Sequence, residues 1–203
     1  MRKMFKDLRK IKLKDFLFPL IIFVAIFAIG LTFDLVSKSV IMEHLKYQEG
    51  VPQTFIGSFV RLTLTYNKGA AWSLGGGATW SRILLVIISW AVAVFIPCYI
   101  VYRMSKNDKF SLIKWIAIAL VWAGDIGNLI DRTFFYERGV VDFLDITAWW
   151  PGFGIFNIAD SCLVVGLFML IGIIIYEVIK EAIDNNKRKN NLVSEKQEEN
   201  KEE

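Results

Sequence analysis

Long runs of apolar residues constrain this chain more than any other feature, because each run can cross a lipid bilayer as a helix. A helix needs about 20 mostly apolar residues to span a hydrocarbon core of roughly 30 Å. The hydrophobic fraction of 55% also lies above the level of about 45–50% that is typical of soluble domains. The predicted spans are Phe16–Phe33, Ile83–Tyr102, Trp115–Ile130 and Ser161–Tyr176. We therefore predict an all-α membrane protein with four transmembrane helices.

The placement of lysine and arginine predicts how these helices are oriented, because loops rich in these residues stay in the cytoplasm. Seven of them precede the first span, and four each lie in residues 103–114 and 180–189. The two longer loops, residues 41–79 and 133–156, hold only three and one. Both termini are therefore predicted to be cytoplasmic and the longer loops extracytoplasmic. The same asymmetry explains the net charge of +4, so no nucleic-acid partner is expected.

Three parts of the chain follow from this arrangement. Residues 1–15 form a basic cytoplasmic N-terminal extension, residues 16–180 a single four-helix membrane domain, and residues 181–203 a charged cytoplasmic tail. The tail is rich in Lys, Glu and Asn and poor in apolar residues, which is typical of disorder. We expect it to be disordered from Asp184 onward.

The extracytoplasmic loops carry signs of local structure. Apolar and polar residues alternate from Phe59 to Tyr66, which is typical of a half-buried strand. The turn sequence Asn67-Lys68-Gly69 follows the strand. Trp72, Trp149 and Trp150 suit the membrane–water interface. These loops therefore predict a small structured surface outside the membrane.

Polar residues in the spans gather at one depth. When each helix is followed in its predicted direction, its polar residues fall at the extracytoplasmic end. They are Asp34, Lys38, Asn128, Asp131, Arg132, Asn157 and Asp160. Scattered structural polar residues would not align in this way, so we infer a shared site at that level.

The third span shows the alignment within one helix. Gly124, Asp125, Asn128, Asp131 and Arg132 recur at a spacing that places them on one helical face. An alternative interpretation is a packing seam between helices with a contact between the charges of residues 131 and 132.

Two aspartates indicate the chemistry of this site. Asp142 lies in an apolar run, and Asp160 follows it by 18 residues at the start of the fourth span. A charged carboxylate costs about 2.5–3.5 kcal/mol at mid-bilayer and less near the interface. Asn157 and Asp160 also suit a helix N-cap and first turn, but that alternative leaves Asp142 unexplained. The pair is typical of an aspartic protease.

The sequence gives little support for catalysis by a metal ion, a serine triad or a phosphate-binding loop. The chain has one histidine, His44, and no HExxH sequence, so no metal site is expected. A Ser-His-Asp triad would have to use the same histidine. No glycine-rich phosphate loop is present, and no cofactor is expected.

Two non-protease interpretations remain open from the residues alone. The aspartates of a small transporter can form a proton relay, but the second span carries no charge between Arg82 and Arg103. A non-catalytic scaffold would leave the paired aspartates unexplained.

Five motifs carry a resemblance to a known family. They are Asp34-x-x-x-Lys38, Asn67-x-Gly69-Ala70-Ala71-Trp72, Gly127-Asn128-Leu129-Ile130-Asp131-Arg132, Val140-Val141-Asp142-Phe143 and Phe156-Asn157-x-Ala159-Asp160-Ser161. Their order and spacing resemble those of the bacterial lipoprotein signal peptidases, also called signal peptidase II, over roughly residues 34–165. The presenilin type of intramembrane aspartyl protease fits less well, because its Gly-x-Gly-Asp signature is absent.

The resemblance implies a four-helix enzyme of the bacterial inner membrane with an extracytoplasmic β-cradle. Its expected partners are membrane lipid and diacylglyceryl-modified prolipoproteins, which it would cut just before the lipidated cysteine. The resemblance assigns catalysis to Asp142 and Asp160 and implies neither a metal, a cofactor nor an oligomer. The residues that match supporting or substrate-contacting positions are Asp34, Lys38, Asn67, Gly69, Asn128, Asp131, Arg132 and Asn157.

One residue departs from the pattern of the family. Asp125 stands where the family usually has a small residue. We expect it to form a structural ion pair with Lys38 or Arg132.

Overall fold

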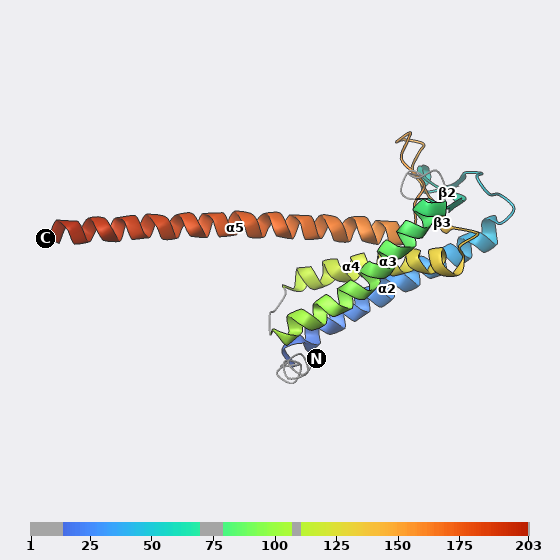
Figure 1. Ribbon diagram of the computed structural model, residues 1–203. Coiled ribbons are helices and arrows are strands. Elements are labelled where there is room, and N and C mark those ends of the chain that lie inside the picture. Colours follow the sequence, from blue (N-terminus) through green and yellow to red (C-terminus); the bar gives the residue numbers. More distant parts are fainter. Residues whose placement is uncertain (1–13, 70–78, 107–110, 203) are drawn as a thin grey trace.

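The computed structural model describes residues 14–69, 79–106 and 111–202. Most of the N-terminal extension lies outside these residues, as do Ala70, Ala71 and Trp72 of the second motif. The helices are α2 (Lys14–Leu45), α3 (Thr79–Ser105), α4 (Leu112–Phe134) and α5 (Ile158–Glu202), and the strands are β1 (Gln53–Phe55), β2 (Gly57–Asn67) and β3 (Val140–Asp145). Figure 1 shows α2, α3 and α4 side by side, with the sheet at the end of the bundle away from the N-terminus.

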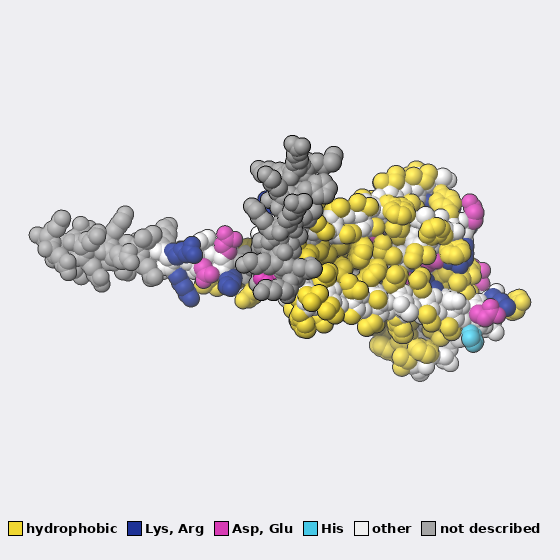
Figure 2. Space-filling view, turned by 90° about the horizontal axis from the view of Figure 1, so that it is seen from below, with side chains coloured by type: hydrophobic (Ala, Val, Ile, Leu, Met, Phe, Trp, Pro, Cys, Tyr) yellow, Lys and Arg dark blue, Asp and Glu magenta, His cyan; other side chains and the backbone are white. Residues whose placement is uncertain are grey.

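The four helices confirm the four predicted spans. Each is long and apolar enough to cross a membrane. Figure 2 shows apolar side chains over most of the visible face of the bundle, as a lipid-facing surface requires. The first span is longer than predicted, because α2 continues through Asp34 and Lys38 to Leu45. The two charges are tolerated inside the helix because they lie one turn apart and pair with each other.

Helix α5 is the longest element of the described residues. It continues as one helix from Ile158 to Glu202 and extends far beyond the bundle (Figure 1). Lysine, glutamate, glutamine and arginine are all good helix formers, so a charged sequence can prolong a helix that starts in an apolar segment.

A three-stranded antiparallel sheet with the order β1-β2-β3 confirms the predicted strand and adds two neighbours. Strand β2 pairs with β3 in a register that sets Thr65 opposite Asp142 and Asn67 opposite Val140. Strand β3 reads as an apolar run instead of an alternating pattern, because both of its faces are almost entirely buried. The sheet thereby carries one candidate aspartate into the interior.

A small apolar cluster holds the sheet against the end of α2. Ile41 and Leu45 of α2 pack with Leu64 of β2 and with Val141 and Phe143 of β3. Val141 and Phe143 flank the candidate aspartate in sequence. The cluster therefore fixes β3 on both sides of that residue.

Glycines allow α5 to approach α4 closely. A Cβ atom at Gly124 would lie 2.3 Å from the carbonyl oxygen of Ala159 and 2.7 Å from Cγ of Leu163. Small residues at helix contacts are typical of membrane proteins, because backbones then pack directly. Helix α4 is also the most buried of the four spans, so it is the central element of the bundle.

We predict that Gly124→Ala lowers the free energy of unfolding by about 1–3 kcal/mol, because the new methyl group meets backbone that cannot move aside. The control is Gly172→Ala on α5, where a Cβ atom meets nothing within 4 Å. Unfolding of both variants in detergent micelles measures the difference. Equal stability of the two variants would contradict the close packing of α4 on α5.

Candidate active site

Asp142 lies on β3 with its carboxylate in the interior. Its Oδ1 accepts a hydrogen bond from Nδ2 of Asn157 at 2.7 Å, and its Oδ2 accepts one from Nδ2 of Asn67 at 3.0 Å. Burial and the nearby negative charge of Asp160 raise the pKa of Asp142 to about 7, although the bonds from the two asparagines oppose the shift. Near neutral pH this carboxyl can therefore gain or lose a proton.

Asp160 lies in the first turn of α5 and forms a reciprocal cap with Asn157. The backbone N–H of Asp160 donates to Oδ1 of Asn157 at 2.8 Å, and the backbone N–H of Asn157 donates to Oδ2 of Asp160 at 3.2 Å. This pairing has the geometry of a capping box. The N-cap interpretation is therefore correct, and it coexists with the paired aspartates instead of replacing them.

Two asparagine amides connect the carboxylates. Nδ2 of Asn128 donates to Oδ1 of Asp160 at 2.8 Å, while its Oδ1 lies 3.1 Å from Nδ2 of Asn157. The same Nδ2 of Asn157 reaches Asp142. One amide network thus joins Asp142 and Asp160 from a strand and two helices.

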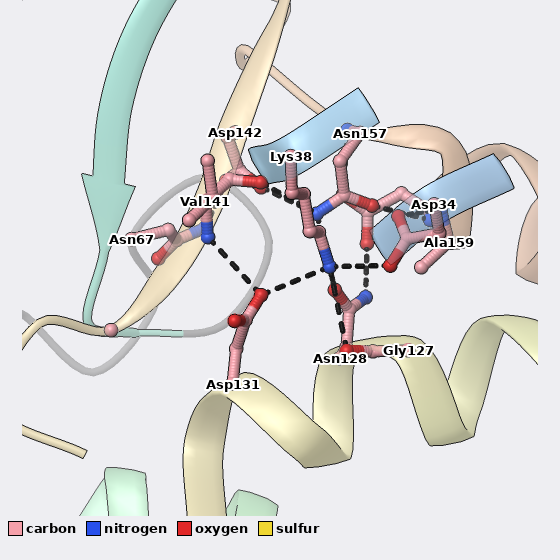
Figure 3. A network of polar contacts seen from close by, with 12 residues as sticks. Asp34, Lys38, Asn67, Gly127, Asn128, Asp131, Val141, Asp142, Asn157 and Ala159 are labelled. Carbon is pink, nitrogen blue, oxygen red and sulfur yellow. Dashed lines mark hydrogen bonds and ion pairs between the residues drawn. The ribbon is translucent and has the colours of Figure 1, made fainter. Parts of the chain in front are cut away.

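A buried lysine adjoins this network, and Figure 3 shows its nitrogen at the centre of contacts with Asp34, Asp131 and Asn128. Nζ of Lys38 is 2.7 Å from Oδ2 of Asp34 and 3.0 Å from Oδ2 of Asp131. It also donates to Oδ1 of Asn128 at 3.1 Å. The side chain of Lys38 is only 3% exposed, so its charge is balanced inside the protein.

The two carboxylates that flank Lys38 each hold backbone next to a candidate aspartate. Oδ1 of Asp34 accepts the N–H of Ala159 at 2.8 Å, and Oδ2 of Asp131 accepts the N–H of Val141 at 3.4 Å. Ala159 precedes Asp160, and Val141 precedes Asp142. Lys38 therefore ties together two carboxylates that fix the backbone immediately before each of the paired aspartates.

Arg138 completes this charge network, and the sequence analysis missed it. Its Nη2 lies 2.5 Å from Oδ1 of Asp131, and its guanidinium lies over the ring of Phe135. The alternative contact between Asp131 and Arg132 is not the one formed, because Asp131 pairs with Lys38 and Arg138. One feature of the sequence could have identified Arg138 as a partner of Asp131. It is the only Lys or Arg in residues 133–156.

Arg132 instead lines an open groove that also contains both candidate aspartates. The groove has a volume of about 520 Å³. Its polar lining consists of Asn67, Arg132, Asp142, Asp160 and Ser161. Its other lining residues are Val140, Phe153, Gly154, Ile155, Phe156, Leu163, Val164 and Val165. Such a groove offers polar groups to a peptide and apolar side chains to a lipid chain.

Gly69 supports the site through the turn after β2. Its N–H donates to Oδ1 of Asn67 at 2.9 Å, which is the bond of an Asx-turn. The bond orients the Asn67 amide so that Nδ2 points to Asp142. All ten sequence-predicted site residues thus lie in or beside one assembly.

Asp125 does not form the predicted ion pair. Within the described residues, Lys38 pairs with Asp34 and Asp131. No salt bridge joins Arg132 to Asp125 there, although the two charges attract each other at longer range. The Asp125 carboxyl instead bonds with Ser89 of α3. The expectation fails because α4 turns this residue toward α3, whereas Lys38 lies on α2.

The described part of the chain contains no cluster of three or more His, Cys, Asp or Glu side chains arranged to hold a metal ion. The two aspartates receive amide donors, which suits carboxylates that handle protons.

Comparisons with known proteins agree with this geometry. The family model described as signal peptidase (SPase) II matches residues 26–176. A lipoprotein signal peptidase of Staphylococcus aureus strain MRSA252 is 36% identical over 151 residues, which cover 74% of this chain and 84% of that protein. A counterpart from strain Newman matches to the same extent.

Two solved structures share the fold. Both are described as bacterial membrane enzyme structures obtained by the in meso method, at 2.3 Å and 1.9 Å resolution. Each is 30% identical, with TM-scores of 0.63 and 0.62. They cover 77% and 75% of this chain, and 88% and 91% of their own chains are matched.

Fold, family and relatives together define a membrane-embedded protease of the aspartic type. Within that class, the chain belongs to the signal peptidase II family.

We predict that Lys38→Met lowers the free energy of unfolding by about 3–5 kcal/mol, because it leaves two buried carboxylates without their shared cation. Lys46→Met is the matched control, since Lys46 directly follows the same helix and forms an exposed ion pair with Glu43 in its last turn. An exposed pair contributes about 0–1 kcal/mol. Unfolding measurements in micelles compare the variants, and a small equal loss in both would show that Lys38 is not the centre of the network.

Proposed function

We propose that this chain removes signal peptides from prolipoproteins, cutting the bond just before a cysteine that carries diacylglycerol. One observation carries the proposal. Two carboxylates that asparagine amides join together line the same groove as a set of apolar side chains. Membership of the signal peptidase II family and the names of the relatives support it.

The proposed reaction uses a water molecule activated between Asp142 and Asp160. Burial and the neighbouring charge of Asp160 raise the pKa of Asp142 to about 7, so the pair can carry one proton near neutral pH. The ionised member takes a proton from the water as it attacks the scissile carbonyl carbon. The protonated member donates a hydrogen bond to the carbonyl oxygen, and a proton then passes to the departing amine. The titration belongs to the pair and not to either residue alone.

The other polar groups of the groove would hold the peptide. Arg132 lines the groove beside both aspartates and presents a fork of N–H donors, which suits peptide carbonyl oxygens. Asn67 is half-buried and lines the same groove. Because Asn128 and Asn157 are occupied with the carboxylates, we assign to them the orientation of the pair.

The apolar side chains of the groove would receive the lipid of the substrate. Val164 and Val165 line the groove from α5, a helix that can span the membrane, and Phe153 and Phe156 line it from the segment before α5. A diacylglyceryl group could therefore remain among apolar side chains while the peptide reaches the aspartates. This arrangement fits a site at the extracytoplasmic face of the bacterial inner membrane, with both termini in the cytoplasm.

We predict that Asp142→Asn and Asp160→Asn each lower the cleavage rate at least about 100-fold, the scale of general acid–base catalysis. The measurement uses purified protein in lipid with a diacylglyceryl-modified prolipoprotein. Asp125→Asn is the matched control, because it makes the same change in a buried carboxylate that faces Ser89. Normal cleavage by the two dyad variants would make the aspartates structural and exclude the proposed mechanism.

We predict that kcat/KM falls as the pH rises through about 7, because the proton shared by the pair is then lost. Asn67 donates to Asp142 and favours its ionised form, so Asn67→Ala raises the pKa of Asp142 further. In that variant, the pH at which kcat/KM falls should therefore be higher than in the wild type. A pH–rate profile whose limb stays in place or moves to lower pH would contradict the assignment.

A further inference from the structure

Exposed aromatic side chains gather beside the sheet. They are not among the polar residues that line the groove. Ring stacking joins Phe59 of β2 to Trp149, with centroids 4.7 Å apart and planes at 8°. Trp149 contacts Trp150, with centroids 6.0 Å apart. With Phe55 and Ile56 at the β1–β2 turn, these residues form what we call the aromatic patch. Each of the five side chains is between 48% and 59% exposed.

The segments that carry the aromatic patch are free of charge. No Asp, Glu, Lys or Arg occurs in residues 50–60 or in residues 146–157. The adjoining charges, Arg61 and Asp145, pair with each other at 2.9 Å, and Asp145 is buried. Hydrogen bonds from Thr147, Thr63 and Arg61 outweigh burial and hold the pKa of Asp145 at about 2. An apolar surface without charge is unusual on the water-exposed part of a protein and indicates something that covers it.

The aromatic patch is continuous with the apolar wall of the groove. Trp150 contacts Phe153 with ring centroids 4.9 Å apart, and Phe153 meets Phe156 edge-on at 5.7 Å. Phe153 and Phe156 line the groove together with Val164 and Val165, which are each 51% exposed on the spanning helix α5. The series of rings therefore leads from the β1–β2 turn to a helix face that lies in lipid.

We propose that the aromatic patch is a lipid-docking surface that seats in the interfacial layer of the bilayer at the mouth of the groove. Tryptophan prefers this layer because its ring is apolar while its N–H can bond to water or headgroups. The absence of charge suits lipid, and the continuity with α5 places the aromatic patch beside the hydrocarbon region. Docking would hold the loop between β3 and α5, and with it the Phe153–Phe156 wall, against the membrane. The docking itself does not depend on the proposed peptidase reaction.

The test places a nitroxide label on the aromatic patch of the full chain in phosphatidylcholine vesicles, without substrate. Cys98 and Cys162 are first replaced by Ala, and single cysteines are then introduced by Trp150→Cys or Phe59→Cys. Glu49→Cys is the control, an exposed charged position in the loop that precedes β1. Collision with oxygen reports exposure to lipid, and collision with a water-soluble nickel chelate reports exposure to water.

We expect the labels at positions 150 and 59 to collide several-fold more with oxygen, relative to nickel, than the label at position 49. Nickel accessibility equal to that of the control would overturn the proposal, because the aromatic patch would then face water. Low accessibility to both reagents would also overturn it, because protein, such as a second copy of this chain, would then cover the aromatic patch. A normal cleavage rate in the labelled variants separates failure of docking from failure of the proposed function.

Discussion

The ammonium of Lys38 is the interaction on which the rest of the site depends. It lies between Asp34 and Asp131. Without it, Asp34 would be a buried, uncompensated charge, and Asp131 would keep only its ion pair with Arg138. Breaking such a pair is far more costly than losing an exposed one, because water cannot replace the missing partner. The same two carboxylates accept the N–H groups of Ala159 and Val141. One cation on α2 thus sets where α5 begins and where β3 runs, and with them the separation of the paired aspartates.

The membrane explains why this network is so completely satisfied. Polar side chains in an apolar surrounding need partners within the protein, and here amides and opposite charges supply them. The carboxyl oxygens of Asp142 and Asp160 accept hydrogen bonds from asparagine donors. The proton shared by the pair is then the part of the network that can be gained or lost. A relay across the membrane would continue through the bundle. The buried polar side chains of the described residues instead concentrate at the sheet end, with Asp125 and Ser89 as the exception facing α3.

The four spans and the depth of the polar residues could be predicted from the sequence, because apolar length and helical spacing are local properties. The partners of the charges could not. The alternative interpretation of the third span joined Asp131 to its neighbour Arg132. The helix instead turns Asp131 toward Lys38 and Arg138, which only the packing of α2 and of the loop before β3 reveals. Strand β3 could not be predicted from an alternation of apolar and polar residues, because both of its faces are buried. The extent of α5 could not be predicted, because charge and low hydrophobicity are compatible with disorder as well as with a solvated helix.

Amide hydrogen exchange tests most directly whether Lys38 positions the paired aspartates. NMR of the 15N-labelled protein in micelles can follow the N–H groups of Val141 and Ala159 in the wild type and in Lys38→Met. The account predicts that both lose protection together, while the N–H of Phe143, which bonds to the carbonyl of Phe156, keeps its protection. Unchanged protection at Val141 and Ala159 in the variant would contradict it, because the backbone before each aspartate would then be held without the lysine.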